Sequence, residues 1–431
     1  MNPWVGMAVV TGILAGGMWM VSKQARRWGW DAEVARKSIH MVMGLVCLTF
    51  PLLFREAWPV GALACGATLG LAVVRWVPRF RKEVGGALHG VTRASWGELC
   101  FAPAVALVFV LAGDRVELFA APVLVLTLAD AAGAVAGSRW GRSRYGVGRG
   151  WKSVEGSAVF WVLSIGCVGV PAMMARSAGL DQVVWMAVAV GLLATMAEGL
   201  SDRGLDNAVL PLWVFFLMQR FLGLEVNEVM VRCGVVVLML LVILLVGRFS
   251  TLDGGALMAS ALLGYGLALL GGMGFLGVAM GLFAIHLFTT GHRQLGGVLR
   301  HGRESVFGAA LAMLPWAAAK PWIGREVAWL GCGAGAAAYL VMMHVGTRRH
   351  LGRKGVAPLA GLLKVLVVLG VPVVCSDGFL SLTAVAIGLA GGAMGAWICA
   401  QSTKECGWDA PGWAIARGVM ALGSSAIILG V

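Results

Sequence analysis

The chain has 431 residues, of which 59% are Ala, Val, Ile, Leu, Met, Phe, Trp, Tyr or Cys, and a further 63 are Gly. Only 13% are charged, about half the share found in soluble proteins. This composition excludes a soluble globular protein, a disordered chain and a small disulfide-stabilised scaffold. It predicts an all-α polytopic integral membrane protein, because helices satisfy their own backbone hydrogen bonds in lipid.

The net charge of +13 arises from 34 basic and 21 acidic residues. Nucleic-acid binding would need a basic face on a soluble domain. These charges lie instead in short loops between apolar runs, so no nucleic-acid partner is expected. The nine Cys residues form no CxxC pair and no Cys/His cluster, which argues against a disulfide framework and a structural zinc site.

Apolar runs of the length that crosses about 30 Å of hydrocarbon follow one another along the chain. We predict about 14 to 16 transmembrane helices in two helical-bundle halves, one of residues 1–222 and one of residues 228–431, separated by the polar segment Leu224–Glu228. The predicted spans lie near 3–21, 38–53, 58–74, 96–112, 116–137, 157–175, 182–200, 208–222, 229–247, 255–270, 272–290, 304–319, 328–346, 357–375, 379–400 and 411–430.

The loops between these spans differ in charge. When the spans alternate across a membrane, most of the 34 basic residues fall on one side. The positive-inside rule assigns that side to the cytosol. We therefore expect an integral protein of a bacterial inner membrane, with lipids as its surroundings.

Five polar blocks interrupt the apolar background of the first half, and the predicted topology places all of them at cytosolic span ends. Such convergence is expected of a site for a water-soluble reactant. The residues of interest are Arg36, Lys37 and His40; Arg93 and Glu98; Asp130, Gly137 and Gly141; Arg149, Lys152, Ser153 and Glu155; and Glu198, Asp206 and Asn207.

Asp130 lies within an otherwise apolar helix. An ionised carboxylate there costs several kcal/mol unless it faces a cavity, a cation or a metal. Two interpretations are open: a helix-packing ion pair with a neighbouring Arg, or a Mg²⁺ ligand, since hard oxygen ligands suit Mg²⁺ bound to phosphates. Glu198, near the end of its span, has the same two interpretations.

The segment from Ser143 to Ser153 carries three Gly, two Arg and a Lys immediately before a helix. Backbone N–H groups at Gly positions, a helix N-terminus and a Lys together favour a phosphate cradle. The segment departs from a Walker A loop because Trp151 precedes Lys152 where that loop has Gly. The alternatives are structural: the preceding GxxxG ridge packs helices, Ser153 and Glu155 cap the next helix, and Lys152 is a topology charge.

In order, the five blocks read ARKSIHMVMG (Ala35–Gly44), TRASWGELCFAP (Thr92–Pro103), LADAAGAVAGSRWG (Leu128–Gly141), WKSVEGS (Trp151–Ser157) and EGLSDRGLDNAVLP (Glu198–Pro211). They resemble the polyprenol kinase family, which includes phytol kinase and dolichol kinase and is related to the CTP-using phosphatidate cytidylyltransferases. The resemblance covers about residues 30 to 215. It implies phosphorylation of a long-chain isoprenoid alcohol, such as phytol or a polyprenol, by CTP or another nucleoside triphosphate.

The resemblance also implies roles for individual residues. Asp130 and Glu155 match the acidic, metal-linked positions and would hold Mg²⁺. The predicted catalytic residues are Asp130, Lys152, Glu155 and Glu198. The predicted nucleotide-binding residues are Arg36, Lys37, His40, Gly137, Gly141, Arg149, Lys152 and Ser153. Arg93, Glu98, Asp206 and Asn207 match polar positions without an assigned role.

Two other functions fit the sequence less well. A phosphatidate cytidylyltransferase is the first alternative, but Asp202–Asp206 has one residue too many for that enzyme's DRxD ending. A non-catalytic transporter would need a polar pathway at the bilayer centre, whereas the carboxylates of the first half lie at one edge.

The second half resembles, more loosely, the membrane family that includes plant phytyl-phosphate kinase. Three segments carry this likeness, namely Gly247–Gly264, Thr347–Gly361 and Gly388–Gln401. Where that family has an acidic stretch, this chain reads YLVMMH from Tyr339 to His344. We therefore expect a degenerate domain rather than a second kinase.

Overall fold

The computed structural model describes residues 2–76, 97–148, 150–201, 204–290, 301–350 and 411–426. Within them the chain is almost entirely helical and divides into two compact units, Met1–Leu238 and Met239–Val431. The predicted site residues Arg93 and Arg149 lie outside these ranges, as do the predicted spans 357–375 and 379–400.

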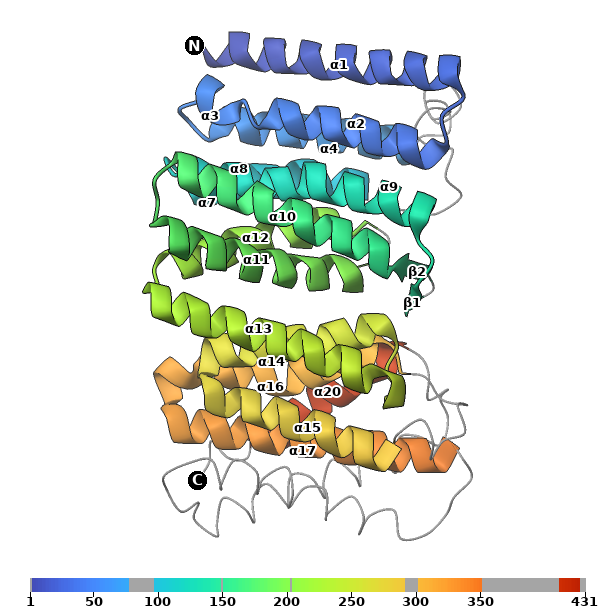
Figure 1. Cartoon of the computed structure of the whole chain (residues 1–431), viewed down its shortest axis with the longest axis vertical. Helices are drawn as coiled ribbons and strands as arrows, with labels where there is room; N and C mark the ends of the chain where they lie inside the picture. The colour runs from blue at the N-terminus through green and yellow to red at the C-terminus, as the bar shows by residue number, and fades with distance from the viewer. Residues whose placement is uncertain are drawn as a thin grey trace. The chain divides into compact units, whose positions relative to one another are not determined.

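All five polar blocks belong to the first unit by residue number, whose helices and hairpin are labelled in Figure 1. Its elements are α1 (Pro3–Trp28), α2 (Ala32–Cys47), α3 (Phe50–Leu53), α4 (Trp58–Trp76), α7 (Gly97–Ala112), α8 (Val116–Leu124), the π-helical turn η1 (Val125–Ala129), α9 (Asp130–Trp140), β1 (Arg144–Val147), β2 (Gly150–Ser153), α10 (Val154–Met174), α11 (Leu180–Leu200) and α12 (Asp206–Leu222).

Helix α13 (Val226–Val246) contains the division between the two units. The second unit continues with the 3₁₀ turn η2 (Gly247–Phe249), α14 (Gly254–Gly271), α15 (Met273–Thr290), α16 (Arg303–Ile323), α17 (Arg325–His350) and α20 (Pro411–Ser425). Whether the two halves predicted from the sequence are functional domains stays a prediction.

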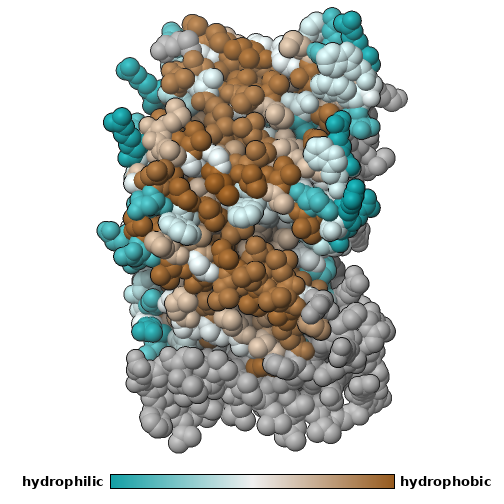
Figure 2. All heavy atoms as spheres, viewed as in Figure 1, coloured by the Kyte–Doolittle hydropathy of each residue, from teal (hydrophilic) through white to brown (hydrophobic). Residues whose placement is uncertain are grey.

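The helices have the length and composition of membrane spans. In the part of the chain that the structure describes, nine are long and apolar enough to cross a bilayer. Hydrophobic residues cover the middle of the helices, and hydrophilic residues gather toward their ends (Figure 2). The prediction of an all-α polytopic membrane protein is therefore confirmed.

One span departs from regular α-helical geometry. Helix α8, the turn η1 and α9 form one continuous helix from Val116 to Trp140, interrupted by a π-helical turn that ends at Ala129. Turns of this kind are rare and occur frequently at functional sites. Asp130 follows the turn directly and lies ten residues before Trp140, so it is about 15 Å along the helix from that end.

The segment after α9 forms a short hairpin rather than an irregular loop. Strands β1 and β2 pair antiparallel, with Tyr145 opposite Lys152. Gly148 has a positive φ of 55° at the turn between them, a conformation that Gly adopts without strain. The backbone N–H of Val154 donates to Ser143 O at 2.9 Å, which holds the hairpin against the start of α10.

Helix α2 approaches the π-helical turn very closely at Gly44. A Cβ atom at this position would overlap the side chain of Thr127, whose own Cβ would be 2.8 Å away. Only the absence of a side chain permits this approach. The contact matters for the site because α2 carries Lys37 and His40, and Asp130 follows the turn.

We expect Gly44→Ala to destabilise the protein by about 1–3 kcal/mol, the usual cost of overpacking. Thermal unfolding of the purified protein in detergent would measure the change. Gly61→Ala in α4 is the matched control, because nothing lies within 4 Å of a Cβ atom built there. Equal unfolding temperatures for the two variants would contradict the close packing of α2 on η1.

Candidate functional site

A buried ion pair joins α2 to the helix that follows the π-helical turn. Lys37 Nζ lies 2.5 Å from Asp130 Oδ2, and the two side chains are only 8% and 4% exposed. Asp130 therefore meets its counter-ion within the protein, as a carboxylate inside a membrane span requires. The partner is a Lys from another helix, not the neighbouring Arg that the sequence suggested.

His40 lies one turn further along α2. Its Nε2 is 3.1 Å from the carbonyl oxygen of Leu126 in the π-helical turn. Because a carbonyl only accepts, Nε2 donates in this bond and Nδ1 is the acceptor. The ring also contacts Phe101 edge-on, with centroids 4.8 Å apart. His40 is thus oriented by two neighbouring helices.

A second ion pair lies where the hairpin meets the end of α11. Lys152 Nζ is 2.5 Å from Glu198 Oε1 and also donates to the carbonyl oxygen of Glu198. The side chains are 22% and 15% exposed, so this pair reaches solvent more than the first. The sequence predicted both residues in the site, and the structure brings them together.

The surroundings keep Lys152 charged. Burial disfavours its ammonium form, but the carboxylates of Glu198 and Asp206 outweigh burial and raise the pKa of Lys152 above its usual value. Burial and the Glu198 charge also raise the pKa of Tyr145 to about 12. At neutral pH the edge of the hairpin therefore presents a cation and a neutral phenol.

The N-terminus of α10 lies at the base of the hairpin. Ser153 caps it, with Ser153 Oγ accepting from Gly156 N at 3.1 Å. The Glu155 carboxylate accepts from Ser143 N at 3.0 Å, which ties the end of α9 to the start of α10. Ser153 thus caps α10 as the structural interpretation expected, whereas the Glu155 carboxylate bonds a residue outside the helix.

The GxxxG ridge of α9 packs against α10. A Cβ atom on Gly137 would lie 2.9 Å from Ser153 Oγ, and one on Gly133 would lie 3.0 Å from Phe160 Cβ. Gly141 likewise adjoins Ser153. The ridge therefore lets the hairpin and the N-terminus of α10 lie close to α9, as expected for small residues at helix interfaces.

The structure brings some of the predicted residues together and separates others. The charge of Lys152 acts on Asp130, and that of Asp130 acts on Glu198, so the two ion pairs belong to one electrostatic cluster. Glu155 is held separately, beside Ser143. Among the described residues no group of three or more His, Cys, Asp or Glu side chains is arranged to hold a metal ion.

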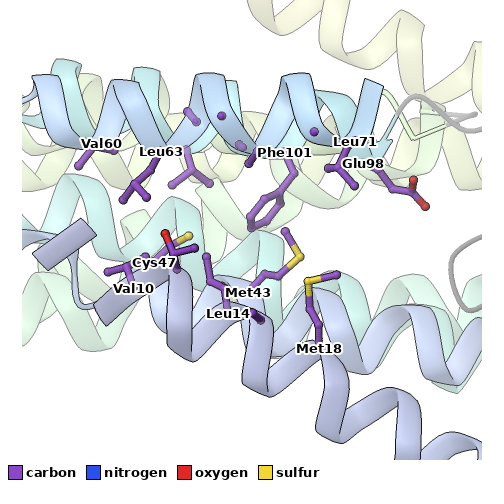
Figure 3. A pocket seen from close by; sticks show the side chains of 18 of the residues that line it. Val10, Leu14, Met18, Met43, Cys47, Val60, Leu63, Leu71, Glu98 and Phe101 are labelled. Atoms are coloured by element: carbon purple, nitrogen blue, oxygen red, sulfur yellow. The ribbon is translucent and has the colours of Figure 1, made fainter. Parts of the chain in front are cut away.

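Three further predicted residues line an apolar cavity. Arg36, Glu98 and Asn207 line it together with His40. Asn207 Nδ2 donates to Gly97 O at 2.9 Å, which fixes α12 against α7. Figure 3 shows Glu98 at one end of the cavity and apolar side chains along the rest.

Sequence reasoning missed two groups in this region. The Tyr145 hydroxyl lies 2.7 Å from Ser157 Oγ. The chain contains only three Tyr residues, and this rarity could have drawn attention to Tyr145. The hydroxyl of Thr127 is buried in the π-helical turn and has no hydrogen-bond partner among the described residues. Nothing in the sequence distinguishes it from other Thr residues in spans.

Over 187 residues the chain is 34% identical to the phytol kinase of Synechocystis sp.. The match covers 42% of this chain and 76% of that kinase. No family model matches the chain. No solved structure matches it significantly.

Proposed function

The chain belongs to the same family as phytol kinase, the polyprenol kinase family, and we propose that it transfers the terminal phosphate of a nucleoside triphosphate, CTP in particular, to an isoprenoid alcohol. The observation that carries this proposal is the electrostatic cluster of two Lys–carboxylate pairs, in which Asp130 interacts with His40 in the lining of an apolar cavity. A kinase of this kind needs a charged site for a triphosphate next to an apolar site for a lipid chain.

The triphosphate binds at the hairpin and the N-terminus of α10. The positive end of the α10 helix dipole favours anions there, and Lys152 adds a charge that remains at neutral pH. Arg142 and Arg144 are exposed on the same segment, with the Arg144 guanidinium 3.8 Å from the centre of the Trp151 ring. These groups neutralise phosphate charge, which is the main requirement of phosphoryl transfer.

The residues present fit a magnesium ion that is held mainly by phosphates. Mg²⁺ usually binds through one or two carboxylates plus substrate phosphates, and Asp130 and Glu198 are the carboxylates of the cluster. Asp130 would hold the ion, which would neutralise charge that develops on the transferring phosphate. Glu155, the other predicted ligand, accepts from Ser143 N and is not one of the two carboxylates paired with a Lys.

The acceptor hydroxyl approaches from the cavity, where His40 is part of the lining and interacts electrostatically with Asp130. Its oxygen attacks the terminal phosphorus, and the bond to the bridging oxygen breaks. The nucleoside diphosphate leaves with that electron pair. The hydroxyl proton passes to a carboxylate of the cluster, with Asp130 as the proposed acceptor. We place this site at the cytosolic face of a bacterial inner membrane, in agreement with the basic loops.

The experiment that tests this function incubates the purified protein in lipid nanodiscs with Mg²⁺ and each of the four nucleoside triphosphates, labelled at the terminal phosphate. Acceptors are phytol, farnesol, diacylglycerol and phosphatidate. We expect label in a prenyl phosphate, and CDP as the product from CTP. Pyrophosphate and a CDP-lipid from phosphatidate would instead identify a cytidylyltransferase, and no product from any acceptor would refute the kinase assignment.

A further inference from the structure

The cavity in the first unit has a polar end and an apolar end. It encloses about 520 Å³ between α1, α2, α4 and α7, within the range of small-molecule sites. In Figure 3 the Glu98 carboxylate lies at one end beside Leu71, while Val10 and Val60 lie at the opposite end. Most of the lining between the ends is apolar, with Phe101 projecting inward from α7. This distribution matches an amphipathic molecule with one polar terminus.

The apolar end is closed by aromatic packing. Phe50 lines the cavity there and belongs to a cluster of rings with Phe54, Phe109 and Phe119, with centroids 5.3 to 6.4 Å apart. Val60 beside it is only 1% exposed. A chain that lies along the cavity with its polar terminus at the Glu98 end therefore stops at this cluster.

The dimensions of the cavity limit the length and the volume of the isoprenoid chain that it can hold. From Leu71 to Val60 on α4 the axial rise is about 16 Å. An extended isoprenoid advances about 5 Å per five-carbon unit, since its bonds are about 1.5 Å long, so about three extended units fit along this length. At roughly 25–30 Å³ per heavy atom, near the share of a water molecule in the liquid, a twenty-carbon alcohol needs about 500–600 Å³. A fifty-five-carbon alcohol exceeds the cavity more than twofold.

Small residues line an opening toward the membrane. Thr11 and Ala15 on α1 and Gly66 and Gly70 on α4 line the cavity and are exposed. Nothing lies within 4 Å of a Cβ atom built on either Gly, so both adjoin open space. A lipid alcohol can enter sideways between α1 and α4 and then lie along the cavity.

We propose that this cavity measures the isoprenoid chain, so that the enzyme prefers alcohols of fifteen to twenty carbons, with Gly66, Val60 and Phe50 as the residues that determine the limit. The hydroxyl lies beside His40, and the chain runs toward the aromatic cluster. The inference rests on the proposed kinase function, because it assigns the cavity to the acceptor.

Gly66 offers a direct test, because it lies about halfway along the lining of α4 and a Cβ atom built there has no atom within 4 Å. The wild-type protein in nanodiscs is assayed with geraniol, farnesol, geranylgeraniol and undecaprenol, of ten, fifteen, twenty and fifty-five carbons. We expect undecaprenol to be at least about tenfold poorer than geranylgeraniol in kcat/KM. Gly66→Leu is expected to lower kcat/KM for geranylgeraniol by about tenfold or more, and for geraniol by less than about threefold. Gly66→Ala is expected to fall between.

Gly61→Leu is the matched control, since the same change on the same helix lies outside the cavity lining. This variant should rank the four alcohols by kcat/KM in the same order as the wild type. Retained geraniol phosphorylation shows that Gly66→Leu has folded. If the wild type has equal kcat/KM for undecaprenol and geranylgeraniol, the cavity does not limit chain length. The same holds if Gly66→Leu ranks the four alcohols as the wild type does. Either result leaves the proposed kinase activity standing. Absence of phosphorylation of every alcohol by the wild type refutes the kinase itself, and with it this inference.

Discussion

Asp130→Asn is expected to reduce phosphoryl transfer by at least about 100-fold, in the range found when one charge-stabilising group is removed from an active site. The substitution keeps the size of the side chain but removes the negative charge that would hold Mg²⁺ and accept the hydroxyl proton. Transfer of labelled phosphate to farnesol by purified protein measures the loss. Glu117→Gln is the matched control, because Glu117 is also buried, lies on the same continuous helix and pairs with Arg115 at 3.1 Å.

The same substitution leaves the Lys37 ammonium buried without its counter-ion. Breaking a buried pair costs about 3–5 kcal/mol, so misfolding has to be separated from lost chemistry. The double variant Lys37→Met with Asp130→Leu replaces the pair with apolar side chains, which is often close to neutral for stability. We expect it to fold and to remain inactive. Wild-type activity in this double variant would show that the pair is structural only.

Lys152→Met should raise the KM for the nucleoside triphosphate and lower kcat, with a combined loss of about 10²- to 10³-fold. The Lys152 ammonium is the charged group that lies beside the N-terminus of α10, and the nearby carboxylates keep it protonated. Steady-state kinetics at varied CTP and fixed alcohol measure both constants.

Removing Lys152 also leaves Glu198 without its partner, so a second variant is needed. Lys152→Met with Glu198→Gln removes both charges and restores neutrality. If Lys152 only holds α11 in place, the double variant should recover the KM of the wild type; if it contacts phosphate, KM should stay high. Lys320→Met in α16 is the control, since Lys320 Nζ donates to Gly271 O in the second unit. An unchanged KM in Lys152→Met would contradict the proposed phosphate contact.

The fold class could be predicted because hydropathy alone requires it. Runs of apolar residues with few charges have no stable alternative to transmembrane helices, and the described spans lie where these runs were found. The ends of the helices were less predictable than their positions. The second predicted span begins near residue 38, but α2 begins at Ala32. Polar residues at a helix start carry no hydropathy signal, although they extend the helix by one and a half turns.

The site was predicted as a set of residues but not as a set of contacts. Lys152 and Glu198 are 46 positions apart, and Lys37 and Asp130 are 93 positions apart, so no local pattern reports either pair. Lys37 was expected at phosphate because it follows Arg36, whereas the structure pairs it with Asp130. The cavity was not foreseen, because its walls on α1 and α4 consist of ordinary apolar and small residues.

The π-helical turn at Val125–Ala129 has a consequence for the length of this helix. Before the turn α8 packs on α10 and α12, and after it α9 packs on α10 as well. A wide turn accommodates an additional residue within a helix, so α8 and α9 keep the same neighbour although the chain between them is longer than a regular helix requires. Deleting one residue at the turn can therefore be absorbed by closing it. Inserting one more residue has no such outlet and would rotate α9 by about 100° relative to α8. Asp130 would then point away from α2, so we expect this span to tolerate the loss of one residue at the turn better than the gain of one.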